Sequence, residues 1–413
     1  MFSPYRRVHL FTCLFLCIGL ISVLGRKWFH SGGQLLGENQ AFRNVGADTI
    51  AQAKWFRVRG ASMAPTLFGE SQQSYCVNCG ERNFFFFFDD AGATTKSLQC
   101  SRCSLSVFDS TDLSSTFAGD QVQVSSFTKR QDFSHRVLQR GDLIALKKDG
   151  AIHVKRLVAF PGEVVGTSGM HLTVNSVRIE DLLYLNECRF PVPWLTVNQD
   201  GDSETSAWKP ETERLPEKVG WNRTKDGHWI IASGDPSWMT YSPGSIGSQN
   251  VNSPVWDDYP FNIGISRKLF SIDRLQVSGV SLNSSWLTFG FWTRRGVRQI
   301  QRKLVAGQPF SINSFDAKEV TNEQLSVTPV AREQPIAIAC NWGGASIKNL
   351  KVERLVEYRL RPYDENLYPV SLSSDECFVL GDNVPISVDS RDWGVISWSS
   401  VIGKVDNVLR FAE

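Results

Sequence analysis

The sequence has almost no net charge, no internal repeat and no long low-complexity tract. Its 44 lysines and arginines nearly cancel 42 aspartates and glutamates, which leaves a formal net charge of +2. Without a basic excess, the composition gives no sign of nucleic-acid binding. Charged residues make up an ordinary 21% of the chain, so nothing indicates a largely disordered protein. The length of 413 residues suggests two to three domains.

Long uncharged hydrophobic sequence is confined to the N-terminus, in the run VHLFTCLFLCIGLISVL of residues 8–24. A helix of this length reaches roughly 25 Å, the low end of what spans a bilayer. We interpret residues 1–30 as an uncleaved single-pass membrane anchor. Two alternatives remain open, a buried core helix and a cleaved signal peptide, although Arg26 would directly follow the only plausible cleavage position, Gly25. Basic residues flank the run on both sides, so the sequence determines its orientation only weakly.

The pattern of apolar and turn residues after the anchor indicates a mainly β protein. The segments RGDLIALKK (140–148) and IHVKRLVAFPGEVV (152–165) predict two strands with turn residues at their ends. Eight of the 13 tryptophans lie between positions 194 and 292, among short alternating runs. Residues 200–362 therefore predict an inserted β-rich domain, a sandwich in the simplest case. Its tryptophans are explained by a sandwich core, or by a sugar-binding face.

One serine and one lysine stand in contexts that suggest nucleophilic catalysis. A serine hydroxyl needs a base, and a lysine kept neutral by burial can serve as one. Ser62 lies between small residues in GASMAPTL, and Lys155 lies in the apolar strand sequence IHVKRLVAF. By alternation Lys155 shares a strand face with His153 and Leu157. Taken singly, a solvated edge lysine and a serine in a turn explain these residues equally well.

Four motifs in order resemble those of type I signal peptidases, the membrane-anchored Ser/Lys proteases that remove signal peptides. They are GASMAPTL (60–67), RGDLIALK (140–147), HVKRLVAFPGEVV (153–165) and GDNVPISVDSRDWGVI (381–396). Any one of them is weak evidence, but four in this order behind a hydrophobic anchor are specific. The resemblance covers roughly residues 25–75, 135–188 and 365–413.

The resemblance implies a role for each matching residue. Ser62 corresponds to the nucleophile and Lys155 to the general base. Ser387 matches the serine that binds and orients the lysine amine. Asp389 and Arg391 match the acidic and basic pair that shapes the site.

Other residues near the motifs receive supporting roles. Gly60 stands where some members carry a Ser or Thr whose hydroxyl stabilises the oxyanion, so the second oxyanion donor stays open. We expect Met63 and Pro65 to fix the turn and to line the binding groove. Asp382 and Asn383 are interpreted as structural turn residues.

The resemblance also implies a fold, substrates and a location. The expected fold is a coiled antiparallel β-sheet with one N-terminal transmembrane helix. The expected partners are signal peptides of secreted preproteins, cut after small residues, and the lipid bilayer; no cofactor is expected for catalysis. The location would be a bacterial-type inner membrane, with the catalytic domain on the extracytoplasmic side. The predicted segments are the anchor (1–30), the catalytic core (31–75, 135–190 and 365–413), a cysteine unit (76–103) and the β-rich insert (200–362).

The cysteine unit has the spacing C-x2-C-x20-C-x2-C, formed by Cys76, Cys79, Cys100 and Cys103. This spacing is typical of a zinc ribbon, in which four thiolates hold one structural zinc ion. Two disulfides or a redox pair are the alternative. Its loop carries five consecutive phenylalanines, residues 84–88, which pack a small core or present rings at a surface. We hypothesise that the unit is a lid or docking element beside the active site.

Three other functions compete with a general signal peptidase. One is a Ser/Lys self-cleaving protease, against which the anchor and the absence of a DNA-binding helix pair argue. Another is a zinc-containing membrane binding protein on an inactive peptidase scaffold. The third is a specialised paralogue with few substrates, which the unusual inserts fit.

Overall fold

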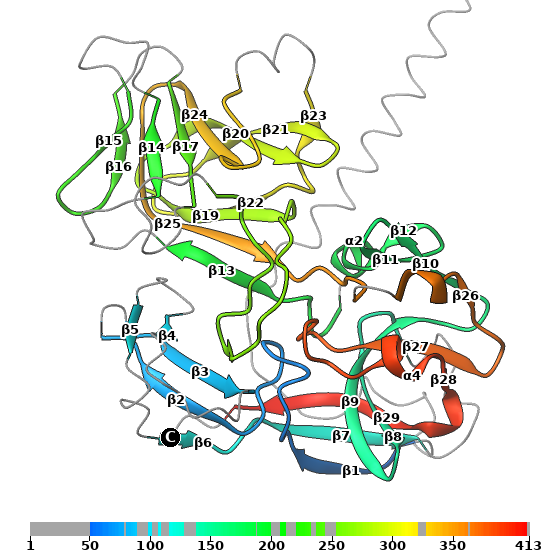
Figure 1. Cartoon of the computed structure of the whole chain (residues 1–413). Coiled ribbons are helices and arrows are strands. Elements are labelled where there is room, and N and C mark those ends of the chain that lie inside the picture. The colour runs from blue at the N-terminus through cyan, green and yellow to red at the C-terminus, as the bar shows by residue number, and fades with distance from the viewer. Residues whose placement is uncertain are drawn as a thin grey trace, which may run out of the picture. The chain divides into compact units, whose positions relative to one another are not determined.

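The computed structural model consists almost entirely of β-sheets, and nearly all of their strand pairs are antiparallel (Figure 1). It describes residues 50–77, 80–88, 98–100, 106–108, 115–127, 138–186, 188–199, 207–211, 220–232, 237–243, 253–320, 328–361 and 364–410. The chain divides into the units Met1–Asp48 and Thr49–Glu413. The first unit, and with it the predicted anchor, lies outside the described residues. Within the described ranges, no helix has both the length and the apolar character needed to cross a bilayer.

The largest sheet has seven strands and contains both predicted strands of the lysine region. Its strands, in spatial order, are β1 (Ile50–Arg57), β7 (Gln121–Phe127), β29 (Val401–Leu409), β8 (Leu143–Lys148), β9 (Ala151–Ala159), β27 (Glu376–Leu380) and β28 (Ile396–Ser397). The predicted core segments omitted β7. It joins β1 to β29, so the core also includes residues between the cysteine unit and position 135.

Both faces of this sheet are covered, which explains the continuous apolar sequence of β8. Leu143 and Ala145 pack on one face with Met63 of the serine loop. Ile144 and Leu146 pack in a separate cluster on the opposite face. Since successive side chains of a strand point to opposite faces, a strand covered on both sides reads as an unbroken apolar run.

A smaller sheet and short helices complete the surroundings of the large sheet. The strands of the smaller sheet are β12 (Val177–Arg178), β11 (His171–Val174), β10 (Val164–Ser168) and β26 (Val370–Ser371). The helices are α2 (Ile179–Leu185), the 3₁₀ turns η4 (Asp364–Leu367) and η5 (Trp398–Ser400), and α4 (Ser390–Trp393).

The cysteine unit contributes strands to two further sheets. One has the order β18 (Asn262–Ile263), β3 (Arg82–Phe87), β2 (Ser71–Tyr75) and β6 (Ser115–Phe117). The other pairs β4 (Leu98–Gln99) with β5 (Ser106–Phe108). Strand β18 comes from the predicted β-rich insert, so the two segments outside the family resemblance share one sheet.

The β-rich insert contains two sheets that enclose one hydrophobic core. The first is formed by β15 (Asn222–Arg223), β16 (Trp229–Ile231), β25 (Ala345–Leu355), β19 (Leu275–Ser281) and β22 (Pro309–Asn313), with β13 (Trp194–Gln199) also paired to β25. The second is formed by β14 (Trp208–Pro210), β17 (Trp238–Tyr241), β24 (Ile336–Trp342), β20 (Ser285–Thr293), β21 (Gly296–Leu304) and β23 (Lys318–Glu319). Trp208, Trp221 and Trp229 are buried in this core, which favours the packing interpretation of these tryptophans over a sugar-binding face.

Candidate active site

Lys155 lies on a central strand and is almost completely buried. Strand β9 is paired on both sides, to β8 and to β27, and the Lys155 side chain is 2% exposed. The solvated edge lysine considered from the sequence is therefore wrong. Its Nζ donates a hydrogen bond to Ser387 Oγ at 3.0 Å and lies 5.8 Å from the centre of the Trp393 ring. His153 contacts the same ring, as expected for residues that share a strand face.

The pKa of Lys155 is lowered to about 8, mainly because burial disfavours the charged ammonium. The negative charge of Asp389 acts in the opposite direction, and the positive charge of Arg391 adds to the lowering. Among the described residues Lys155 forms no ion pair. With this pKa about a tenth of the amine is neutral at pH 7 and about half at pH 8, whereas an ordinary lysine is almost entirely charged at both.

Asp389 does not neutralise Lys155 because Arg391 already binds it on both oxygens. The Arg391 guanidinium donates to Asp389 at 2.9 and 2.8 Å. The Gly381 N–H donates to the same carboxylate at 3.0 Å, and Asp389 caps helix α4. Burial acts to raise the pKa of Asp389, but the pairing with Arg391 outweighs it and lowers the pKa below its ordinary value. Asp389 and Arg391 thus form a buried ion pair, and their role in shaping an active site stays a prediction.

The loop that carries Ser62 is held by Asn383 of the last motif. The backbone N–H of Asn383 donates to the Ser62 carbonyl, and its side-chain amide donates to the Ala61 carbonyl, both at 3.0 Å. Met63 is 1% exposed and packs beneath the large sheet, which suits the predicted fixing of the turn. Because the Met63 side chain is buried, it cannot line a binding groove, and this second role predicted for Met63 is wrong. Pro65 is half-buried.

Ser62 and Ser387 meet at Gly381. A Cβ atom added to Gly381 would lie 2.1 Å from Ser387 Oγ and 2.4 Å from the Ser62 carbonyl oxygen. The Ser62 main chain and the Ser387 hydroxyl therefore approach from two sides at a point where only glycine fits. Ser387 thus adjoins both Lys155 and Ser62. In the described part of the chain no hydrogen bond joins Lys155 directly to Ser62; catalytic hydrogen bonds are often formed only when substrate binds.

A buried ion pair behind the site joins all four motifs, since its arginine also donates to the Gly141 carbonyl at 2.8 Å. Arg156, the residue after Lys155, points to the other strand face and donates to Asp382 at 2.8 and 2.5 Å. Both side chains are fully buried. Asp382 also accepts hydrogen bonds from Tyr358 at 2.6 Å and from Thr66 of the serine loop.

The sequence interpretation of Asp382 and Asn383 as turn residues was therefore incomplete. Both hold the serine loop through side-chain hydrogen bonds. Strand alternation had placed Arg156 opposite Lys155, and an arginine on a buried face requires an acidic partner. That signal could have identified the ion pair with Asp382. No sequence signal marked Asn262, which binds Asn383.

The predicted zinc ligands are described only in part. Cys76 and Cys100 lie in one buried cluster with Phe85 and Leu98, while Cys79 and Cys103 lie outside the described residues. The Gly80 N–H donates to the Cys76 carbonyl, and the Cys76 N–H donates to the Glu81 carbonyl, so the chain reverses at this cysteine. The four-thiolate zinc site stays a prediction.

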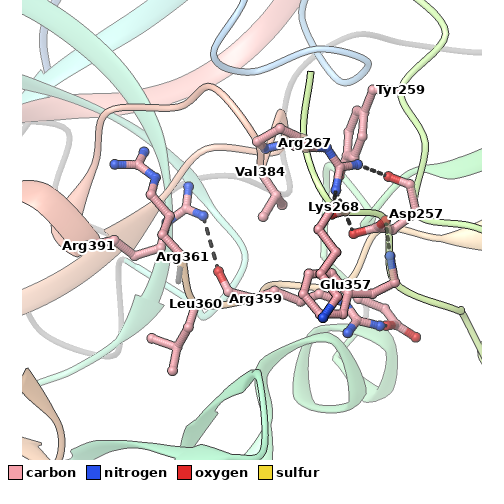
Figure 2. A pocket seen from close by; sticks show the side chains of 12 residues that line it. Asp257, Tyr259, Arg267, Lys268, Glu357, Arg359, Leu360, Arg361, Val384 and Arg391 are labelled. Carbon is pink, nitrogen blue, oxygen red and sulfur yellow. Dashed lines mark hydrogen bonds and ion pairs between the residues drawn. The ribbon is translucent and has the colours of Figure 1, made fainter. Parts of the chain in front are cut away.

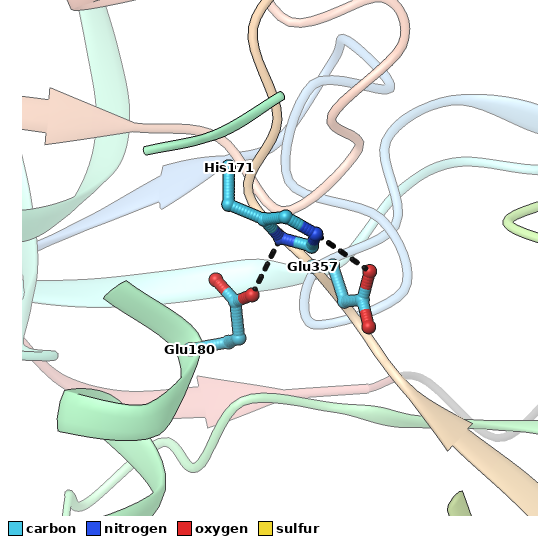
Figure 3. Close-up of side chains that lie close together, drawn as sticks. All are labelled: His171, Glu180 and Glu357. Atoms are coloured by element: carbon cyan, nitrogen blue, oxygen red, sulfur yellow. Dashed lines mark hydrogen bonds and ion pairs between the residues drawn. The ribbon is translucent and has the colours of Figure 1, made fainter. Parts of the chain in front are cut away.

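A second group with metal-ligating side chains consists of His171, Glu180 and Glu357 (Figure 3). His171 Nδ1 lies 2.9 Å from Glu180, and its Nε2 lies 3.2 Å from an Arg294 nitrogen. Since arginine is always a donor, Nε2 accepts and Nδ1 donates, so neither ring nitrogen has a free lone pair for a metal. Arg178 lies 2.5 Å from Glu180 and 3.2 Å from Glu357, where it occupies the position of a cation. These residues do not fit a metal ion and form a buried ion-pair network.

A cavity of about 220 Å³ adjoins the last motif (Figure 2). Val384, Pro385 and Arg391 of that motif are among the residues that line it, whereas neither Ser62 nor Lys155 does. Its arginines are already in ion pairs, for example Arg267 with Asp257 at 3.0 Å. The cavity is therefore separate from the proposed reacting groups.

Comparison with known families gives a match for part of the chain. Residues 316–410 match the family described as signal peptidase, peptidase S26. The matched residues include Ser387, Asp389 and Arg391, whereas Ser62 and Lys155 lie outside them. The match begins within the predicted β-rich insert, earlier than the predicted boundary at 365. No curated protein matches the chain.

Burial of Lys155 should lower the stability of the folded protein. Below pH 8 the Lys155 amine is charged in both the folded and the unfolded protein, so folding includes the full free-energy cost of burying that charge. Between pH 8 and the ordinary lysine pKa of 10.5 only the unfolded chain keeps the proton, and the cost declines as the pH rises. We expect Lys155→Met to raise the free energy of unfolding by about 1–3 kcal/mol at pH 7, with a smaller gain at pH 10.

Denaturant unfolding of the full chain at both pH values measures this effect. Lys147→Met, at an exposed position of the neighbouring strand, is the matched control and is expected to change little. A Lys155→Met protein no more stable than wild type at pH 7 would contradict the account.

Proposed function

We propose that the protein is a membrane-bound signal peptidase of the S26 type, a serine endopeptidase that removes signal peptides from secreted preproteins after small residues. The observation that carries this proposal is the buried Lys155, with its pKa of about 8, bonded to a serine that adjoins Ser62. The S26 match over the last motif supports the same class.

In the proposed reaction Ser62 is the nucleophile and Lys155 the general base. Neutral Lys155 takes the proton of the Ser62 hydroxyl while Ser62 Oγ attacks the scissile carbonyl. The resulting ammonium gives that proton to the leaving amine as the peptide bond breaks. Lys155 then takes a proton from a water molecule, which attacks the acyl-enzyme carbonyl. As the ester bond breaks, the Lys155 ammonium returns that proton to Ser62 Oγ, and the product leaves with its new carboxyl group. Ser387 holds the amine toward the reacting atoms throughout.

The negative oxygen of the tetrahedral intermediate needs hydrogen-bond donors. In the described part of the chain no acceptor takes the Ser62 N–H, so this N–H is available as one donor. Gly60 has no side-chain hydroxyl, so a second donor must come from another group. Small residues around Ser62 would let a substrate backbone approach closely.

Membrane attachment through residues 1–30 completes the proposal. A substrate signal peptide arrives in the bilayer, and Ser62 follows the hydrophobic run by a short segment of chain. Trp55 of β1 and Phe87 and Phe88 of the cysteine unit are each more than one-third exposed. Exposed aromatic side chains of this kind suit contact with a membrane surface or an apolar peptide. The catalytic part would act on the extracytoplasmic side.

Cleavage of a preprotein with an Ala-x-Ala site tests the proposal directly. Full-length wild type in liposomes is expected to remove the signal peptide, at a rate that rises with pH around a midpoint near 8 as Lys155 becomes neutral. Ser62→Ala and Lys155→Ala are expected to lose about a thousandfold or more in rate, because nucleophile and base act as a unit. Lys147→Ala is the control.

Two results would count against this function. Cleavage that survives Ser62→Ala would exclude the Ser/Lys mechanism. A folded wild type that leaves the preprotein intact would favour a paralogue with restricted substrates or a membrane binding protein.

The proposal includes a structural zinc ion held by Cys76, Cys79, Cys100 and Cys103. Clustering of Cys76 with Cys100 supports it. We expect about one zinc per chain by elemental analysis of the purified protein, since four thiolates bind one tetrahedral ion. Cys76→Ser and Cys100→Ser should lose the metal, whereas Cys188→Ser should keep it. Zinc-free protein with Cys76 and Cys100 in disulfide bonds would contradict the site.

A further inference from the structure

The two segments outside the family resemblance meet next to the serine loop. Strand β18 of the insert runs parallel to β3 of the cysteine unit. The Phe86 N–H donates to the Phe261 carbonyl at 2.8 Å, and the Phe88 N–H donates to the Ile263 carbonyl at 3.1 Å. These bonds fix the main chain on both sides of Asn262.

The same junction packs against the end of the serine loop. The ring of Phe68 lies 4.6 Å from Phe84, 6.1 Å from Phe86 and 5.9 Å from Phe261, measured between ring centres. The cysteine unit and the insert thus share one aromatic cluster with the serine loop. Asn262 is placed beside this cluster with little freedom to move.

Asn262 binds Asn383 through two reciprocal hydrogen bonds. Its amide nitrogen donates to Asn383 Oδ1 at 2.7 Å, and its own Oδ1 accepts from Asn383 Nδ2 at 2.9 Å. Asn383 is fully buried, and the same Nδ2 donates to the Ala61 carbonyl. An amide nitrogen has two protons, so Asn262 and Ala61 use both.

Loss of Asn262 would leave the buried Asn383 amide with one proton and one oxygen unpaired. A buried polar group without partners favours rotation toward any other partner. Rotation of this amide would remove its hydrogen bond to the carbonyl of Ala61, the residue before Ser62, and leave that carbonyl with only the bond from the Ala64 N–H. The position of the nucleophile would then be less well defined.

We propose that Asn262 is a positioning residue for catalysis, which acts through Asn383 to hold Ser62 in place. The inference rests on the proposed function. It assigns a role in the reaction to the insert, which supplies a side chain to the site from outside the family resemblance.

Kinetics of full-length variants test this role. We expect Asn262→Ala to lower kcat for a preprotein about ten- to hundredfold with little change in KM, because small displacements of a nucleophile reduce the rate strongly. Asn262→Asp keeps the acceptor for Asn383 Nδ2 but loses the donor, so its kcat should fall between wild type and Asn262→Ala. Asn222→Ala, at an exposed position of the same insert, is the matched control.

A double-variant comparison distinguishes positioning from general destabilisation. If Asn262 acts through Asn383, Asn262→Ala combined with Asn383→Ala should have the kcat of Asn383→Ala alone. Two effects that multiply, or a wild-type kcat in Asn262→Ala, would overturn the proposal.

Hydrogen exchange keeps the inference separate from the proposed function. The N–H groups of Ala64 and Leu67 are bonded within the serine loop. Their exchange should be faster in Asn262→Ala and Asn383→Ala than in wild type, and unchanged in Asn222→Ala. Unchanged exchange in Asn262→Ala would overturn the inference even in a protein that cleaves preproteins, and faster exchange would support it even without cleavage.

Discussion

The buried ion pair between Arg156 and Asp382 is the interaction on which the rest of the site depends. Each residue is the immediate neighbour of a site element: Arg156 follows Lys155, and Asp382 lies between Gly381 and Asn383. Thr66 brings the serine loop to the same carboxylate. A buried charge that loses its partner costs about 3–5 kcal/mol, so neither motif can shift without the other.

Lys155 loses its proton at an unusually low pH because the carboxylates around it are already paired with arginines. Arg391 binds Asp389, Arg156 binds Asp382 and Arg361 binds Asp392, so the three nearby carboxylates are each paired with an arginine. Burial then dominates and lowers the pKa of Lys155. The hydrogen bond from Lys155 Nζ to Ser387 Oγ and the nearby Trp393 ring orient the amine with neutral groups, which do not raise its pKa as a carboxylate would. Burial of the Lys155 amine thus lowers the stability of the fold but makes the amine a stronger candidate base, a trade-off that is common at functional sites.

Local patterns in the sequence predicted the mainly β fold and the strands around Lys155, because apolar runs and turn residues report on nearby geometry. Motif order predicted that Lys155 and Ser387, far apart in the chain, meet in the fold. Partners fixed by tertiary structure were missed. The ion pair of Arg156 required knowing which buried carboxylate faces that strand. Asn262 lies in a loop-like sequence without a motif, and its contact with Asn383 depends on pairing between two inserts.

Direct titration of the Lys155 amine is the measurement that tests the central claim most closely. Nuclear magnetic resonance of the full-length protein with lysine labelled next to the amine would follow each side chain, and Lys155→Met would assign the signal. The account predicts that Lys155 titrates near pH 8. Titration of Lys155 above pH 10, as for an ordinary exposed lysine, would contradict a neutral general base at this position.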